Sequence, residues 1–193
     1  MKTALILQAQ IRDIEPTISR RIVVPATITL PQLHDVIQII FGWEDCHLWQ
    51  FGFGKTDYTC PGSDDDGDFA GPGRDCRSAY DIKLVDALAA KKKFSYWYDF
   101  GDDWHVDIKL ERTIESDHAV VPQCSEGARA GPPDDCGGPG GYMNLLDVLV
   151  GPKNAEQEEM LDWFGGEFDP AKCDLGAMNA DLKRAFNQSV KRK

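Results

Sequence analysis

The residues best suited to chemistry crowd one short segment of the chain. Residues 98–111 have the sequence YDFGDDWHVDIKLE, in which Asp99, Asp102 and Asp103 come just before His105. A carboxylate beside an imidazole can orient the ring as a general base, and both groups can also bind a divalent metal. The same residues would equally suit an ion pair at the end of a β-hairpin, which contributes under ~1 kcal/mol. Asp99, Asp102, Asp103 and His105 are therefore candidate binding residues, with both interpretations open.

The alternation of side chains predicts how this hairpin pairs. Large apolar residues alternate on both strands: Phe94, Tyr96, Tyr98 and Phe100, then Trp104, Val106, Ile108 and Leu110. An odd-numbered turn puts both sets on one core face, whereas an even-numbered turn would not. A three-residue turn, 101–103, pairs Phe100 with Trp104. It also predicts that Asp99 faces His105, with their Cβ atoms about 5 Å apart.

Further donor groups lie elsewhere in the sequence. His47 follows Cys46 at the start of a predicted strand, and a divalent transition metal accepts both residue types. The candidate metal ligands are His47, Asp102 and His105. Residues 131–142, GPPDDCGGPGGY, add Asp134 and Asp135, which could cap the backbone or bind a ligand there. The prediction is that the 99–105 tip and this second loop share one cleft.

Several familiar sites are absent from the sequence. It contains no G-x-x-x-x-G-K-[ST] or G-x-G-x-x-G motif for a nucleotide and no G-x-S-x-G motif of a serine hydrolase. Residues 63–68, SDDDGD, do not fit the spacing of an EF-hand, so we expect a solvated acidic loop there. His34 lies at the edge of an apolar helical face, where a packed core histidine is the expected role.

The predicted elements indicate an α+β protein. Strands are expected at 4–12, 19–24, 48–53, 57–60, 94–100 and 104–111, and helices at 30–41, 84–90, 142–149, 154–164 and from 178 onward. Thr29 and Gln32 form a capping box for the first helix, and Gly42 is its expected end. We expect a mostly antiparallel sheet with a β-β-α-β start resembling a β-grasp, and C-terminal helices packed on it. The chain is expected to be a single domain, 1–193, with a sheet-and-helix core (1–115), a Gly/Pro loop (116–141) and a helical C-terminal part (142–193).

Composition limits the function classes. The net charge of −11 repels phosphate backbones and disfavours general nucleic-acid binding. No segment approaches the ~20 apolar residues of a membrane span, and polar residues interrupt the apolar start of the chain, which predicts a strand and not a secretion signal. We therefore expect a cytoplasmic protein with its six cysteines reduced. No cofactor is evident apart from a divalent metal that the His and Asp residues could hold.

The chain resembles the plasmid Ri ORF-three-like family over nearly its whole length. The resemblance is carried by RRIVVPATITLPQLHDVIQIIFGWEDCHLWQF, FSYWYDFGDDWHVDIKLE, C-x-x-G-x-R-x-x-PPDDCGG-x-x-GY and FDP, in that order. It implies an α+β domain without an assigned biochemical function, and some members carry a transposon-passenger or resolvase-like label. The positions that recur in the family correspond here to His34, Gly42, Trp43, His47, Tyr98, Asp99, Gly101, Asp102, Trp104, His105, Cys124, Pro132, Pro133, Asp135 and Gly137. At position 134, this chain has aspartate where the family pattern has glutamate.

Two functional hypotheses follow. The first is a non-enzymatic binding or adaptor module, because no complete catalytic motif is present; its partner, a protein or a small molecule, is not specified by the sequence. The alternative is a metal-dependent, hydrolase-like enzyme that uses the His and Asp residues at the 99–105 tip.

Overall fold

An eight-stranded sheet organises the molecule. The computed structural model describes residues 1–60, 73–152, 155–163 and 168–190, and its strand order is β5-β4-β3-β6-β7-β1-β2-β8. The strands are β1 (Lys2–Ile11), β2 (Ser19–Pro25), β3 (Trp49–Phe53), β4 (Thr56–Thr59), β5 (Asp75–Ser78), β6 (Lys93–Tyr98), β7 (Trp104–Ser116) and β8 (Gln123–Ala128). Only the β4–β5 pair is parallel among these neighbours. The predicted α+β class with a mostly antiparallel sheet is thus confirmed.

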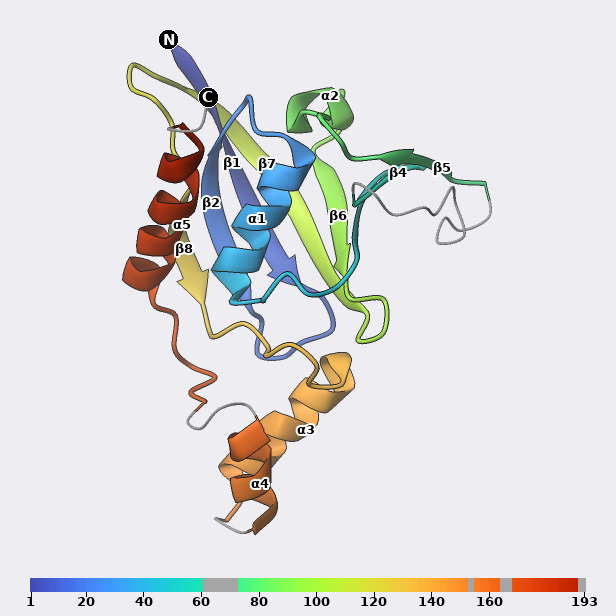
Figure 1. The fold of residues 1–193 in the computed structure, drawn as a ribbon, viewed down its shortest axis with the longest axis vertical. Coiled ribbons are helices and arrows are strands. Elements are labelled where there is room, and N and C mark those ends of the chain that lie inside the picture. The colour runs from blue at the N-terminus through green and yellow to red at the C-terminus, as the bar shows by residue number, and fades with distance from the viewer. Residues whose placement is uncertain (61–72, 153–154, 164–167, 191–193) are drawn as a thin grey trace.

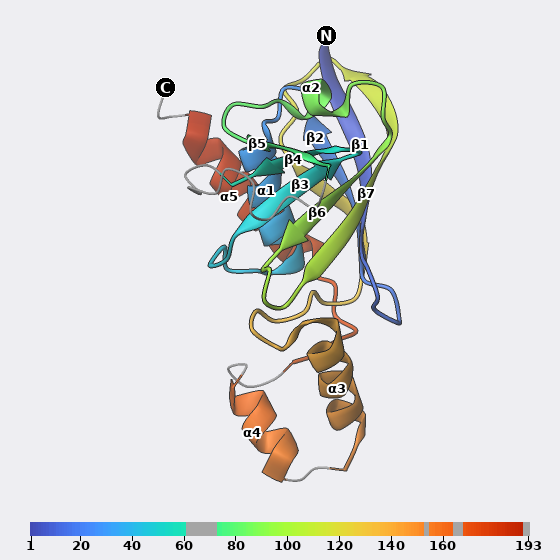
Figure 2. The ribbon, with the colours of Figure 1, turned by 90° about the vertical axis from the view of Figure 1, so that its right-hand side faces the viewer.

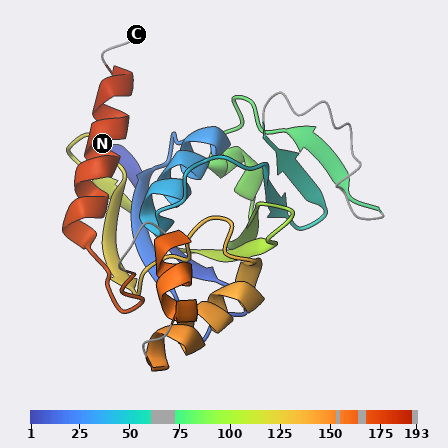
Figure 3. The same cartoon turned by 60° about the horizontal axis from the view of Figure 1, so that its bottom comes forward.

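Helices cover one face of the sheet and extend beyond one end of it. Helices α1 (Leu30–Phe41) and α5 (Leu175–Val190) lie on the same side of the sheet, and α5 contacts β8 and α1 (Figures 1 and 2). The short α2 (Leu84–Leu88) lies at the opposite end from α3 (Gly138–Val150) and α4 (Ala155–Trp163). Figure 3 shows α3 and α4 together below the sheet, apart from α5. Of the C-terminal helices, α5 therefore packs against the sheet, whereas α3 and α4 extend its end.

The first helix forms for the predicted reasons. The Thr29 side chain accepts from the Gln32 amide, and the Gln32 side chain accepts from the Thr29 amide, which completes the capping box. Gly42 ends the helix in the left-handed conformation at φ +79°. The helix buries its apolar face on the sheet, and two polar residues on that face, His34 and Gln38, are buried as well.

The β6–β7 hairpin has the predicted face but not the predicted register. Tyr98 pairs with Trp104 and Trp97 with His105, so the turn comprises Asp99–Asp103 and not three residues. The expected pairing of Asp99 with His105 is therefore wrong. Its physical cause is local: the Asp99 carboxylate accepts from the Gly101 amide at 2.9 Å, and Asp99 has φ +51°, so the turn begins before Phe100 can join the strand. Because five is also an odd number, the aromatic residues within the strands keep the predicted core face, whereas Phe100 lies in the turn with its ring against Trp97.

Residues 116–141 are not the continuous loop that their composition indicates. Strand β7 continues to Ser116, and β8 pairs along the edge of β2. The side chain of Asn179 on α5 bonds both the amide and the carbonyl of Cys124, at 2.8 Å each, as a neighbouring strand would. This tertiary contact compensates for a segment, QCSEGA, that has few strand-forming residues.

The remaining predictions about the fold have different outcomes. The likeness to a β-grasp is not confirmed, because β3 pairs with β4 and β6, far from β1. The acidic segment 63–68 lies outside the described residues, as do the two end residues of the helix expected at 154–164. The structure has no disulfide among the six cysteines, all of which lie in its described residues. Among the described residues, no helix has the length and apolar character to cross a bilayer.

Candidate functional site

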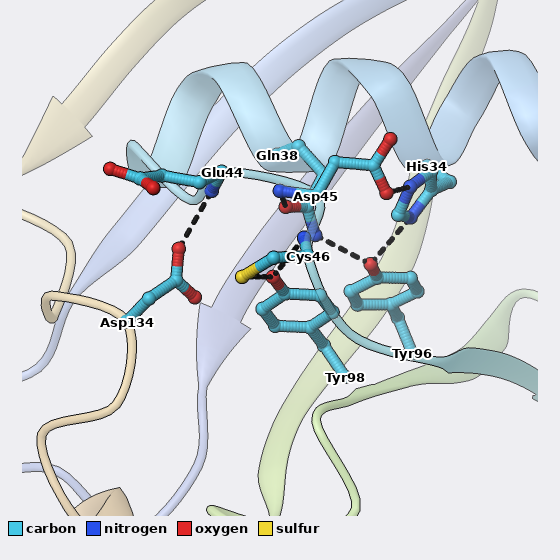
Figure 4. Close-up of polar contacts among 8 residues, drawn as sticks. All are labelled: His34, Gln38, Glu44, Asp45, Cys46, Tyr96, Tyr98 and Asp134. Carbon is cyan, nitrogen blue, oxygen red and sulfur yellow. Dashed lines mark hydrogen bonds and ion pairs between the residues drawn. The ribbon is translucent and has the colours of Figure 1, made fainter.

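The loop between α1 and β3 is fixed by side chains from three elements. Three successive backbone amides each donate to a different side chain: Glu44 to Asp134 Oδ2 (2.7 Å), Asp45 to Gln38 Oε1 (2.9 Å) and Cys46 to the Tyr98 hydroxyl (3.3 Å) (Figure 4). These partners come from the 131–137 loop, α1 and β6. Because every amide of the turn is held, the loop presents the next residue, His47, in a defined place.

A buried chain of hydrogen bonds supports this loop from below. Gln38 donates to the Tyr96 hydroxyl at 2.9 Å, and that hydroxyl lies 2.7 Å from His34 Nδ1. Because the Asp45 carboxylate can only accept, His34 Nε2 donates to Asp45 Oδ1 at 2.7 Å, and in the neutral ring Nδ1 then accepts from the Tyr96 hydroxyl (Figure 4). The His34 ring also stacks on Trp49 at 4.5 Å. His34 is thus a packed core histidine in its neutral form, as the sequence indicates.

This neutral histidine predicts a pH dependence of stability. Burial lowers the pKa of His34, and the bond to Asp45 offsets only part of that effect. Below pH ~6.5 the His34 side chain binds a proton in the unfolded chain but not in the folded protein. Lowering the pH in this range therefore reduces the free energy of unfolding, by at most about 1.4 kcal/mol per pH unit. Between pH 7 and pH 5, we expect wild type to lose more unfolding free energy than His34→Gln, which lacks the titrating ring. Urea denaturation at each pH measures it, and parallel curves for the two proteins would contradict the assignment.

His47 lies between two carboxylates at the end of the sheet. Its Nε2 atom is 3.5 Å from Asp99 Oδ2 and 3.3 Å from Asp135 Oδ1. This nitrogen is buried and forms no hydrogen bond with the described residues. The three donor atoms lie within 4.8 Å of one another. We call His47, Asp99 and Asp135 the His47 site.

The spacing of these atoms suits a metal ion better than direct hydrogen bonds. In tetrahedral coordination with bonds of about 2.1 Å, two ligand atoms lie about 3.4 Å apart. The two separations from His47 Nε2, 3.3 and 3.5 Å, lie on either side of that value. One imidazole and two carboxylates form a mixed nitrogen and oxygen set that divalent first-row metals accept.

Neighbouring groups complete the surroundings of the site. Cys46, His47 and Asp134 form a second trio of donor atoms within 4.8 Å, so His47 belongs to both sets. Burial raises the pKa of Asp134, while hydrogen bonds from the Glu44 amide and the Tyr98 hydroxyl and the nearby His47 counteract part of that shift. Asp134 Oδ1 is buried without a hydrogen-bond partner among the described residues. A third carboxyl group, after those of Asp99 and Asp135, is thus available next to the site.

The hairpin tip and the second loop do meet, through a residue predicted for another role. Asp102 Oδ2 accepts from the Gly137 amide at 3.0 Å, which ties the β6–β7 turn to the start of α3. This bond helps to place Asp135 beside His47. Asp102 thus holds two segments together, which differs from the metal-ligand role that the sequence predicts for it.

His105 and Asp103 belong to a different part of the molecule. His105 points to the sheet face opposite α1, where its ring stacks on Trp97 at 5.2 Å and its Nε2 lies 3.0 Å from Asp103 Oδ1. The predicted metal trio of His47, Asp102 and His105 is therefore not brought together. The structure gathers His47, Asp99 and Asp135, with Asp134 nearby, from the residues that the sequence singled out.

The sequence did not indicate the supporting roles of Gln38, Tyr96 and Tyr98. The one available signal is that His34 and Gln38, two polar residues four positions apart, lie on the apolar face of α1. Buried polar groups need partners, which here come from the inward-facing tyrosines of β6.

Comparison with known proteins identifies the family. Residues 3–177 match the family model described as plasmid pRiA4b ORF-3-like protein. The chain belongs to this family. It is 35% identical to the uncharacterized protein y4hQ of Sinorhizobium fredii over 191 residues, covering 97% of this chain and 96% of that protein. It is also similar to the crystal structure of MM3350, a protein of unknown function from Methanosarcina mazei Go1. The TM-score is 0.76 at 32% identity, over 91% of this chain and 97% of that one.

Proposed function

We propose that this member of the plasmid pRiA4b ORF-3-like family is a binding module that holds a divalent transition-metal ion at the His47 site. The main support is the position of His47 Nε2. This atom is buried, has no hydrogen bond to the described residues, and lies 3.3 and 3.5 Å from two carboxylate oxygens. A buried polar atom without a partner is unfavourable unless something binds it. A cation bound there would also reduce the repulsion between Asp99 and Asp135.

The surrounding structure supports a preformed site. Asp99 is held by the Gly101 amide, Asp135 is placed by the Asp102–Gly137 bond, and His47 follows the loop with three anchored amides. Such bonds orient metal ligands before the ion arrives. The ion would join three segments: the α1–β3 loop, the β6–β7 turn and the loop that leads into α3.

A metal-dependent hydrolase is the second candidate, and it would use the same ligands. Three protein ligands leave a coordination position open, as in catalytic zinc sites, where a bound water becomes a nucleophile. Asp134, a carboxyl group with a raised pKa beside the site, could accept a proton from such a water. This candidate predicts hydrolysis of simple esters that depends on both the added metal and Asp134.

The proposal is tested by titrating untagged protein with Zn²⁺ and Mn²⁺ by calorimetry. We expect one ion per chain, and more than about 100-fold weaker binding in His47→Ala and Asp135→Asn, since loss of a direct ligand exceeds the effect of losing its support. His105→Ala is the matched control, because it removes a partly exposed histidine that also contacts an aspartate. Equal weakening in the control, or no binding by wild type, would refute the site.

A further inference from the structure

A cysteine lies directly beside the proposed metal site. Cys46 precedes His47 in the anchored loop between α1 and β3. Of the six cysteines, all of which the structure describes, Cys46 alone is exposed, and the other five are buried or partly buried. Its amide donates to the Tyr98 hydroxyl at 3.3 Å, which fixes the backbone from which the side chain projects. Cys46 thus combines a defined position with access to solvent.

The sulfur is close enough to His47 to share an ion with it. Cys46 Sγ, a His47 ring nitrogen and an Asp134 carboxylate oxygen lie within 4.8 Å of one another. In a tetrahedral site with metal–sulfur and metal–nitrogen bonds of about 2.3 and 2.1 Å, the sulfur and the nitrogen are about 3.6 Å apart. Because Cys46 is exposed, rotation of its side chain can close the remaining distance, at most about 1 Å.

Two residues of this trio could complete the His47 site, and Cys46 is the easier one to move. Asp134 Oδ2 accepts from the Glu44 amide at 2.7 Å, and the Tyr98 hydroxyl also bonds this carboxylate. Cys46 Sγ makes one polar contact with the described residues, at 3.8 Å from the Tyr98 hydroxyl (Figure 4). A thiol forms only weak hydrogen bonds. An ion would therefore displace one weak contact of Cys46, whereas it would have to compete with two stronger bonds of Asp134.

We propose that Cys46 is the fourth protein ligand of an ion held by His47, Asp99 and Asp135. This inference rests on the metal site proposed above. As the sulfur–metal bond forms, the S–H bond breaks and its proton passes to the solvent, without any redox step. A thiolate among the ligands favours Zn²⁺ over Mn²⁺, which prefers oxygen ligands.

A fourth protein ligand also decides between the two candidate functions. Four protein ligands fill a tetrahedral shell, as in structural zinc sites, and leave no position for a water nucleophile. The ion would then join the α1–β3 loop, the β6–β7 turn and the loop that leads into α3 without acting as a catalyst. The binding module, and not the hydrolase, follows from this coordination.

The test uses Co²⁺ as a spectroscopic probe, because a cobalt–thiolate bond gives a near-ultraviolet charge-transfer band that imidazole and carboxylate ligands do not give. Untagged, reduced wild type, Cys46→Ser and Cys76→Ser are titrated with Co²⁺, and competition measures their affinities for Zn²⁺ and Mn²⁺. Cys76→Ser is the matched control, since it removes a partly buried thiol on the edge strand β5.

We expect the band in wild type and in Cys76→Ser, and its loss in Cys46→Ser. Cys46→Ser should bind Zn²⁺ at least about tenfold more weakly than wild type, since it loses a direct ligand. Its affinity for Mn²⁺ should change by less than about threefold, because Mn²⁺ gains little from a thiolate. The preference for Zn²⁺ over Mn²⁺ therefore falls in this variant and not in Cys76→Ser.

The remaining outcomes separate this inference from the metal site itself. If wild type binds Co²⁺ without the band, or if the band survives in Cys46→Ser, Cys46 is not a ligand, while the three-ligand His47 site stands. In the first case, a loss of Zn²⁺ affinity in Asp134→Asn equal to that in Asp135→Asn would make Asp134 the fourth ligand. If wild type binds none of the three ions, the His47 site and its fourth ligand are both refuted.

Discussion

Arg74→Ala is expected to lower the free energy of unfolding by about 3 kcal/mol. Asp57 has no exposed surface, and its carboxylate is bound by the Arg74 guanidinium through two nitrogens. Removing one partner of a buried pair leaves an uncompensated charge, which typically costs about 3–5 kcal/mol. The lower end applies here because the Arg74 side chain is 34% exposed, so water can reach the vacated space. Chemical denaturation followed by tryptophan fluorescence measures the change.

A neighbouring ion pair provides the matched control. Arg77 pairs with Asp75 on the same strand, β5, but both side chains are more than half exposed, at 59% and 54%. Arg77→Ala should therefore change stability by less than about 1 kcal/mol. The double variant Asp57→Leu/Arg74→Met, which removes both charges, should recover much of the loss. Similar losses for Arg74→Ala and Arg77→Ala would show that burial of Asp57 does not set the effect.

The sequence predicts the faces of the sheet more reliably than its pairings. Alternation alone placed Tyr96, Tyr98, Val106 and Ile108 in the core, because a period of two leaves only the choice of face. It did not reveal where the turn begins. That depended on the Asp99 side chain, which accepts from the Gly101 amide, so that Trp104 pairs with Tyr98 and not with Phe100, a shift of two residues along β6. The choice between two odd turns is made by a single side-chain bond.

The same shift explains which site predictions succeeded. The donor types at Asp99, Asp135 and His47 are visible in the sequence, but their meeting depends on contacts between distant segments. The last pair of the hairpin is Tyr98 with Trp104, so Asp99 lies in the turn and has no partner on β7. Its carboxylate therefore faces His47 and not His105. His105 remains in a strand and faces the other side of the sheet. A register error of two residues therefore assigns Asp99 to the wrong histidine.

The two faces of the β6–β7 hairpin have different surroundings. Tyr98 and Trp104 point into the core, and Tyr98 anchors the Cys46 amide beside the His47 site. Trp97 and His105, their neighbours in sequence, point outward to a pocket on the opposite face. Because successive residues of a strand alternate sides, substitutions at Trp97 should leave metal binding at the His47 site unchanged.

Gly138→Ala is expected to destabilise the protein by about 2–3 kcal/mol and to weaken metal binding. Gly138 has φ +67°, a conformation that costs other residues roughly 1–2 kcal/mol. A Cβ atom there would also lie 2.2 Å from the Asp102 carbonyl oxygen, so the backbone of the β6–β7 turn or of α3 must move. That movement would disturb the Asp102–Gly137 bond and, with it, the place of Asp135 beside His47.

The matched control lies two residues further along the same helix. A Cβ atom at Gly140 would meet nothing within 4 Å, and its backbone is not left-handed. Gly140→Ala should therefore be neutral or stabilise the protein by up to about 1 kcal/mol, since alanine is the better helix former. Denaturant unfolding and Zn²⁺ titration of both variants separate the effects. If Gly138→Ala loses stability but binds Zn²⁺ as wild type does, the position of Asp135 does not depend on the Asp102–Gly137 bond. If Gly138→Ala and Gly140→Ala have the same stability, the close contact of Gly138 with Asp102 does not constrain the fold.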